Sequence, residues 1–114
     1  MKPKNRTTLS TAQALKAVRF ASKTSSLVNR TDHALKRMIE RKISLQEILT
    51  VLGNGRIRED PGFNMSKNSW ECTVQGTVPS TGKPINIVTA IKIGEPGVLV
   101  VTIYDIRDTK LRWK

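Results

Sequence analysis

The sequence predicts one small α+β domain, with helices packed on one face of a small, mostly antiparallel four-stranded sheet. The chain has 114 residues, which is the length of a single domain. Its first half carries apolar residues at helical spacing, whereas its second half alternates apolar and polar residues as strands do. Turn residues separate the strand-like segments. Strands joined by short turns are antiparallel neighbours, and helices that precede them cover one face of their sheet.

The first helix is expected to begin at Ser10 or Thr11, because either hydroxyl can cap the free N–H groups of a first turn. A connection rich in Ser and Thr follows over residues 22–30. The apolar residues of this helix approximate one face and its basic residues fall mainly outside it: Ala14, Leu15, Val18, Phe20 and Ala21 against Lys16, Arg19 and Lys23.

Two further helices are expected before the sheet. The second begins at Thr31 or Asp32, either of which can act as the N-cap, and runs to about Arg41. The third begins at Ser44, where Glu47 stands at the spacing of a capping box, and it stops at Gly53.

Four strands are expected in the second half. Residues 56–59 form a short, charged segment typical of a sheet edge. In residues 70–75 the apolar side chains fall on even numbers, so one face packs and the other faces outward. Isoleucines spaced in twos around Thr89 mark a strand over residues 85–93. Residues 98–106 are apolar on both faces, which predicts a central strand.

The charge of the chain is concentrated at its ends. The 20 Lys and Arg exceed the 9 Asp and Glu, so the net charge is +11 with a neutral histidine. Residues 1–42 hold eleven basic and two acidic residues, residues 43–106 hold five and six, and residues 107–114 hold four and one. We therefore expect a loose basic arm over residues 1–8, a domain over residues 9–106 and a basic tail over residues 107–114. This distribution favours a polyanionic partner, above all nucleic acid.

Composition disfavours several classes of protein. With 38% hydrophobic and 4% aromatic residues, the chain can bury a small core but not a large cofactor cavity. Its apolar runs are too short for a membrane span, and no apolar segment follows the basic N-terminus as a secretion signal requires. The single Cys72 forms neither an internal disulfide nor a zinc site. We expect a cytoplasmic protein without metal, cofactor or membrane contact.

One constellation suggests chemistry. His33, Arg37 and Arg41 project within about 80° of one another on the second helix, beside its apolar stripe. Metal-free RNA cleavage needs this mixture, since an imidazole can move protons near neutrality and guanidinium groups stabilise charge on the phosphate. The alternative is a surface histidine beside solvated arginines, and spacing alone favours that alternative.

A resemblance adds to this observation. The segment His33-Ala34-Leu35-Lys36-Arg37-Met38-Ile39-Glu40-Arg41-Lys42-Ile43-Ser44 resembles the opening His-Ala-x-x-Arg-Met-x-Glu-Arg-x-Ile-Ser of a bacterial family of unknown function. The strand Val100-Val101-Thr102-Ile103-Tyr104 resembles its closing motif, so the similarity spans about residues 31–106. A glycine usual in the family is Lys42 here. The family looks related to RelE-like ribonuclease toxins, which implies helices packed on a sheet that carries the active site.

On that basis Thr102 and Tyr104 share a face of the last strand and can meet the His33 ridge across the sheet. The candidate catalytic residues are His33, Arg37, Thr102 and Tyr104. For Tyr104, a place at the edge of the core is an equally good interpretation. Cys72 is interpreted as buried filler, and Thr89 is assigned no role. The remaining basic residues and an indole that can stack on a base form the candidate RNA contacts: Arg30, Lys36, Arg41, Lys42, Lys110, Arg112 and Trp113.

The leading hypothesis is a small toxin-type endoribonuclease that cleaves single-stranded or ribosome-bound RNA by metal-independent attack of the 2′-hydroxyl. The resemblance implies an acidic antitoxin or immunity protein as its partner. Two alternatives remain. One is a nucleic-acid-binding module without catalysis, which needs only the charge. The other is a toxin of the same fold that acts on a protein such as gyrase.

Overall fold

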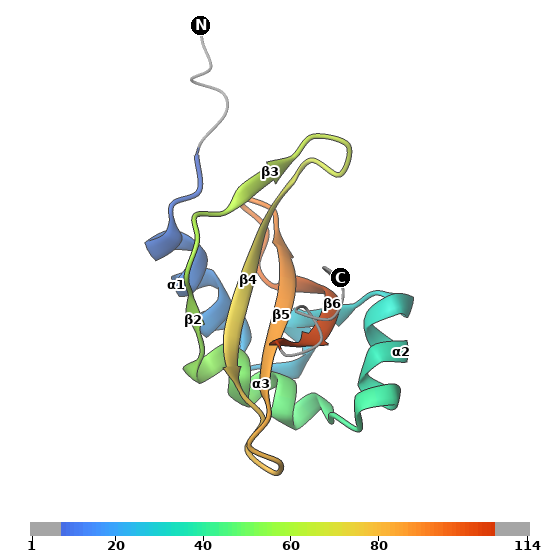
Figure 1. Cartoon of the computed structure of the whole chain (residues 1–114). Helices are drawn as coiled ribbons and strands as arrows, with labels where there is room; N and C mark the ends of the chain where they lie inside the picture. The colour runs from blue at the N-terminus through green and yellow to red at the C-terminus, as the bar shows by residue number, and fades with distance from the viewer. Residues whose placement is uncertain (1–7, 107–114) are drawn as a thin grey trace, which may run out of the picture.

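A computed structural model describes residues 8–106 of the chain (Figure 1). The expected basic tail and nearly all of the expected basic arm lie outside the described residues. The expected α+β class is confirmed, with three α-helices and a mixed sheet of six strands among the described residues. The elements follow in the order α1 Thr11–Ala21, a 3-10 turn Ser25–Leu27, β1 Val28–Arg30, α2 Asp32–Arg41, α3 Leu45–Asn54, β2 Arg56–Ile57, β3 Gly62–Asn64, β4 Ser69–Thr77, β5 Pro84–Ile91 and β6 Val98–Asp105.

The sheet is larger than the predicted four strands and is not purely antiparallel. Its order is β1-β6-β5-β4-β2, with β3 also paired to β4, and β1 runs parallel to β6. The two unexpected strands, β1 and β3, have three residues each. Such short segments show no alternation of their own, so only their pairing with long neighbouring strands makes them strands. The predicted central position of the last strand is confirmed, because β6 lies between β1 and β5.

The core lies between the sheet and the pair α1 and α3, which stand behind the sheet in Figure 1. Even-numbered residues of β4 and odd-numbered residues of β5 point into it, as the alternation predicts. In β6 the register shifts opposite Val88 and Thr89, which turns Val98, Val100 and then Ile103 inward. The opposite side of β4, β5 and β6 is here called the open face. None of the three helices covers it (Figure 1).

Helix α2 lies beside the edge of the sheet rather than on either face (Figure 1). The N-cap is Thr31, whose hydroxyl accepts a hydrogen bond from the Ala34 N–H and donates one to the Val101 carbonyl at 2.8 Å. Its backbone N–H also bonds to the Val100 carbonyl at 3.0 Å. These bonds tie the start of α2 to β6 at the point where its pairing with β1 ends. At the other end Lys42 adopts a left-handed φ of 56°, a conformation that favours glycine.

Helix α3 has the predicted capping box of Ser44 and Glu47. It continues through Gly53 and ends at Asn54, one residue later than predicted. The reason is tertiary, because Arg19 of α1 donates to the carbonyl oxygens of Leu52 at 2.7 Å and Gly55 at 2.6 Å. A guanidinium at this position satisfies acceptors that a helix C-terminus leaves without intrahelical partners.

The capping box also connects α3 to the β4–β5 hairpin and predicts a pH effect. Ser80 donates a hydrogen bond to Glu47, and this bond, with those from Ser44, lowers the pKa of Glu47 below its ordinary value of 4.5. A lowered folded-state pKa stabilises the fold above the unfolded pKa, and the contribution disappears as the pH falls through the folded pKa. We therefore expect Ser80→Ala to lower the melting temperature at pH 7 and to have less effect below about pH 4.

Thermal unfolding followed by circular dichroism at several pH values measures this effect. The control is Ser66→Ala, because the Ser66 hydroxyl bonds to the neutral amide of Asn64. If Ser80→Ala lowers the melting temperature by the same amount at every pH, that result would contradict the proposed dependence on the charge of Glu47.

Candidate functional site

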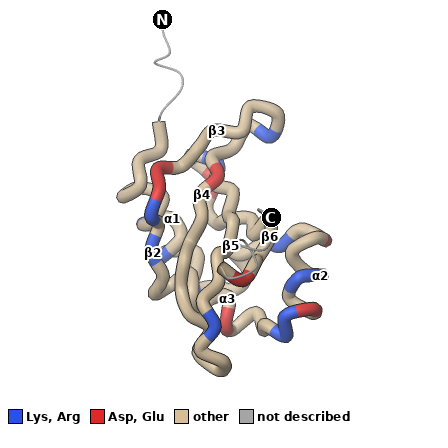
Figure 2. Tube along the Cα trace, in the orientation of Figure 1, with Lys and Arg blue, Asp and Glu red and all other residues tan. Residues whose placement is uncertain are grey.

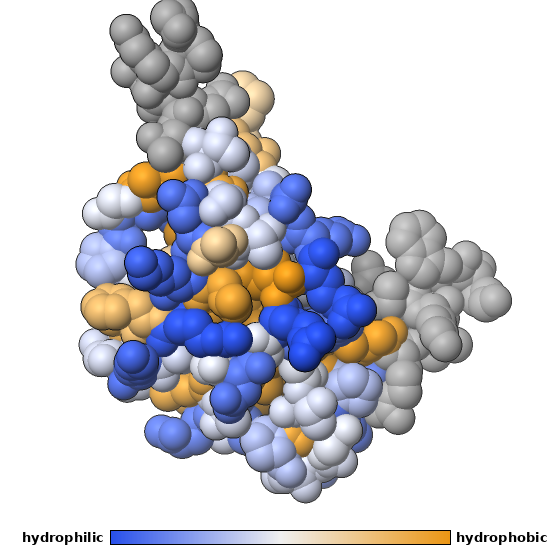
Figure 3. Space-filling view, turned by 90° about the vertical axis from the view of Figure 1, so that its left-hand side faces the viewer, coloured by the Kyte–Doolittle hydropathy of each residue, from blue (hydrophilic) through white to orange (hydrophobic). Residues whose placement is uncertain are grey.

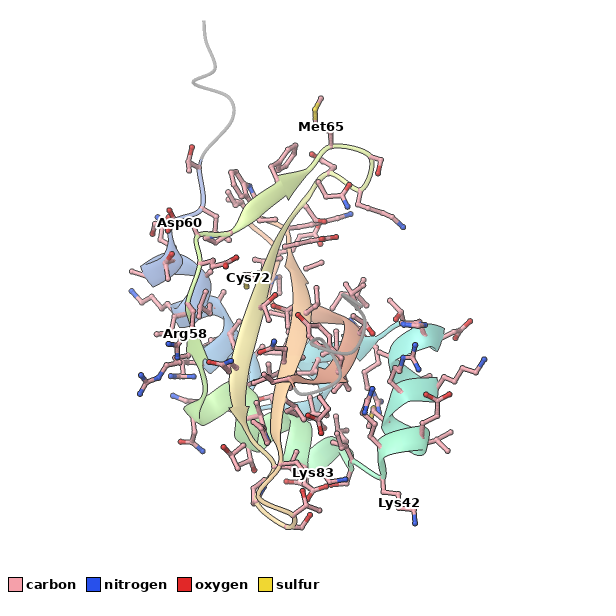
Figure 4. All side chains as sticks on the ribbon, viewed as in Figure 1. Lys42, Arg58, Asp60, Met65, Cys72 and Lys83 are labelled. Atoms are coloured by element: carbon pink, nitrogen blue, oxygen red, sulfur yellow. The ribbon has the colours of Figure 1, made fainter. Side chains whose placement is uncertain are left out.

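The open face carries a hollow of about 920 Å³ between the outward side chains of the three long strands. We call it the open-face hollow. Polar residues from four segments line much of it: Arg58, Glu71, Thr73, Gln75, Asn86 and Tyr104. Arg58 follows the edge strand β2, at the left of the sheet in Figure 4. Tyr104 pairs in register with Asn86, so it belongs to β6 on the other side of the hollow.

Hydrogen bonds hold the polar groups of this hollow in place. Arg58 donates to the side-chain oxygen of Gln75 at 3.0 Å, and Asn64 donates to the Glu71 carboxylate at 3.0 Å. The hollow therefore presents a guanidinium, a carboxylate and a phenol to one space. Its charge is not basic, because Glu59, Asp60 and Glu71 outnumber Arg58 among the lining residues.

The predicted ridge on α2 does not converge on this hollow. His33 is exposed in the first turn of α2, two residues after the bond of Thr31 to β6. Arg37 is half-buried and forms an ion pair with Glu40 at 2.6 Å. Arg41 is half-buried at the far end of the helix, where it lines a separate hollow of about 270 Å³ together with Asp105. The structure thus spreads the three residues along α2.

The predicted sharing of a face by Thr102 and Tyr104 is confirmed. Both are half-buried, and they pair with the outward residues Val88 and Asn86 of β5. Tyr104 lines the open-face hollow. Thr102 lies two residues earlier on the same face of β6 and is not among the residues that line the hollow.

The side chains of Thr89 and Cys72 are buried, and of the two only Cys72 is among the residues that line the open-face hollow. The Thr89 hydroxyl donates to the Cys72 carbonyl at 3.0 Å and lies 3.1 Å from its sulfur. Burial raises the pKa of the Cys72 thiol, which suits a packed residue rather than a nucleophile.

The predicted RNA contacts have different surroundings. Lys36 and Lys42 are exposed on α2 and just after it, while Arg30 is half-buried at the end of β1. Lys110, Arg112 and Trp113 lie outside the described residues.

The thirteen basic and eight acidic residues of the described segment give a net charge of +5. The rest of the charge of +11 belongs to residues 1–7 and 107–114.

Sequence reasoning missed most of the open-face hollow. Glu71, Thr73 and Gln75 were predicted to look outward from their strand, and this alternation was the available signal. It did not reveal that Arg58 reaches the same surface, because that contact depends on the pairing of β2 with β4.

Two kinds of feature are absent from residues 8–106. No group of three or more His, Cys, Asp or Glu side chains in this range is arranged to hold a metal ion. Among the same residues, no helix is both long enough and apolar enough to cross a membrane.

A comparison with known families identifies the family of this domain. A model described as "Domain of unknown function (DUF4258)" matches residues 31–105. The chain belongs to the DUF4258 family. The matched segment begins at the cap of α2 and ends with β6, so the DUF4258 region contains all but one strand of the sheet and the open-face hollow. Helix α1 and strand β1 precede it. No curated protein and no solved structure matches the chain.

Proposed function

We propose that this DUF4258 protein is a small endoribonuclease, similar to RelE-like toxins, that cleaves single-stranded or ribosome-bound RNA without a metal ion. The observation that carries the proposal is the open-face hollow, where Tyr104, Arg58 and Glu71 line one space. These three groups supply a proton donor, a fixed cation and a proton acceptor. The basic charge of the chain supports RNA as the substrate.

The proposed reaction is attack of an RNA 2′-hydroxyl on the adjacent phosphorus. The Glu71 carboxylate accepts the 2′-hydroxyl proton while the O2′–P bond forms. The P–O5′ bond breaks, and Tyr104 donates a proton to the leaving 5′-oxygen. Arg58 stabilises the negative charge that grows on the phosphate. The products are a 2′,3′-cyclic phosphate and a 5′-hydroxyl.

His33 is the alternative acid or base, for cleavage beside α2 rather than in the open-face hollow, which no α2 residue lines. Its exposed side chain belongs to the first turn of α2. The Thr31 hydroxyl joins this turn to the carbonyl of Val101 in β6, the residue before Thr102. The ion pair with Glu40 does not prevent Arg37 from binding phosphate, because a solvent-accessible pair of this kind contributes at most about 1 kcal/mol.

The test is incubation of the purified full chain with labelled single-stranded RNA, with and without EDTA. We expect cleavage that EDTA does not reduce and products that end in a 2′,3′-cyclic phosphate. His33→Ala is compared with Ile39→Ala, an exposed change on the same helix at a residue without a proposed role. If His33 is the acid or base, its variant alone loses cleavage; intact RNA with the wild-type protein would refute the nuclease proposal.

A binding module without catalysis is the second candidate, and one observation favours it. Among the described residues that line the open-face hollow, the carboxylates of Glu59, Asp60 and Glu71 outnumber the guanidinium of Arg58, which disfavours a polyanion there. In that case RNA binds elsewhere on the molecule and remains uncut. For the nuclease, the basic charge suits an acidic antitoxin or immunity protein as the inhibitor.

A further inference from the structure

A second surface, distinct from the open-face hollow, combines positive charge with an exposed aromatic ring. It consists of Lys16, Phe20 and Lys23 on α1 together with Arg56 on β2, and we call it the α1–β2 face. Figure 2 shows the Lys and Arg positions of α1 and β2 on the same side of the molecule. Figure 3 views this side and shows strongly hydrophilic side chains around an apolar centre.

The arrangement follows from how α1 packs. Its core contacts are Ala14, Val18 and Ala21, all fully buried, so the opposite side of the helix faces solvent. Lys16 and Lys23 stand four residues before and three residues after Phe20, which places the three side chains together on that side. Phe20 was predicted to belong to the apolar face, but 59% of its surface is exposed.

Neighbouring contacts fix the position of α1 relative to β2. The Arg19 guanidinium bonds to the carbonyls of Leu52 and Gly55, immediately before Arg56. At the other end of the helix, the Thr11 hydroxyl donates to Asp60 at 2.7 Å. The two segments therefore run antiparallel, with the basic residues Lys23, Arg19 and Arg56 gathered at one end and the acidic Glu59 and Asp60 at the other.

Charge favours an anionic partner at the basic end. No acidic residue occurs before Asp32, so every charged side chain of α1 and of the connection after it is positive. Helix α1 also lies outside the segment that matches DUF4258. The hollow of the open face has the opposite balance, which leaves the α1–β2 face as the better surface for a chain of phosphates.

We propose that the α1–β2 face binds single-stranded RNA, with Lys16, Lys23 and Arg56 contacting phosphates and Phe20 stacking on a base. Stacking of unpaired bases on exposed aromatic rings between basic side chains is a general way to bind single strands. The choice of RNA rests on the proposed function, whereas the charge and the exposed ring do not. A lipid surface is a poorer match, because the buried apolar residues of α1 leave Phe20 as its one large, strongly exposed apolar side chain.

The experiment measures binding of the full chain to a short, fluorescent 2′-O-methyl oligouridine by anisotropy at several salt concentrations. This probe lacks the attacking hydroxyl, so binding is separated from cleavage. The double variant Lys16→Ala/Lys23→Ala is compared with Lys83→Ala/Lys92→Ala, which removes the same charge elsewhere; Figure 4 shows Lys83 at the far end of the β4–β5 hairpin.

We expect the α1 double variant to bind more weakly and to reduce the slope of log K against log salt by about 1.4, while the control keeps both near wild type. Phe20→Ala is expected to weaken oligouridine binding at least about fivefold, Phe20→Tyr to preserve it, and inorganic polyphosphate binding to be unchanged by either.

Three outcomes would overturn the proposal. In the first, the α1 double variant binds the oligouridine as wild type does. In the second, both double variants bind the oligouridine equally weakly, which assigns binding to net charge alone. In the third, the α1 changes abolish binding to phosphatidylserine vesicles but not to the oligouridine. Wild-type protein that binds the probe through this face but leaves unmodified RNA intact would refute the nuclease proposal and support this one.

Discussion

Tyr104→Phe is expected to slow RNA cleavage by about 10²- to 10⁴-fold, the usual contribution of a positioned general acid. The substitution removes only the phenolic oxygen from the open-face hollow and keeps the ring on β6. We expect the affinity for 2′-O-methyl RNA to stay close to that of wild type, because the lost group acts on the leaving oxygen. Single-turnover cleavage under saturating protein measures the chemical step directly.

The control for this prediction is Thr24→Val, which removes an exposed hydroxyl that makes no capping bond. Equal unfolding midpoints for wild type, Tyr104→Phe and Thr24→Val would show that the slower cleavage by Tyr104→Phe is not caused by loss of folding. A Tyr104→Phe protein that cleaves at the wild-type rate would remove Tyr104 from the chemistry and leave it the role of a tyrosine at the edge of the sheet.

Gly55→Ala is expected to destabilise the fold by about 3 kcal/mol or more, because a methyl group in a closed backbone junction forces the main chain apart. An added Cβ would lie 2.6 Å from the Gln75 carbonyl oxygen, 2.7 Å from that of Val51 and 2.8 Å from a Val74 methyl group. Its φ of −74° suits any residue, so the constraint is space rather than backbone conformation.

Gly62→Ala is the matched control, since its added methyl group would meet nothing within 4 Å. Urea unfolding followed by tryptophan fluorescence gives the free energy of unfolding of each variant. Equal destabilisation by the two substitutions would contradict the steric explanation. The same junction directs the chain from α3 into β2, so a surviving Gly55→Ala protein is also expected to place Arg58 less accurately at the hollow.

The helix positions were largely predictable because their signals are local. Thr31 and Ser44 cap helices through bonds to residues three positions away, and the sequence contains both partners. The alternation of β4 correctly separated its buried from its outward residues. By contrast, β1 exists because Val28 pairs with Val98, seventy positions along the chain, and no local pattern carries that information.

The candidate site also has some features that the sequence predicts and others that it does not. The shared face of Thr102 and Tyr104 was predictable from the two-residue period of a strand, and the β6 register confirms it. His33, Arg37 and Arg41 lie on one helix, α2, as the sequence predicts. Their expected meeting with Tyr104 depended on where α2 lies, and the structure places α2 beside the edge of the sheet, with Arg41 in a different hollow from Tyr104.

The sequence by itself determined the α+β class, the helix starts, the outward faces of the long strands and the excess of positive charge, because each depends on composition or on neighbours a few residues apart. Tertiary structure alone decided which of these features meet. The pairing of β2 with β4 brings Arg58 to Gln75, and the packing of α1 on α3 exposes Phe20 between two lysines. Contacts between distant segments depend on the shape of the whole core, which no local pattern specifies.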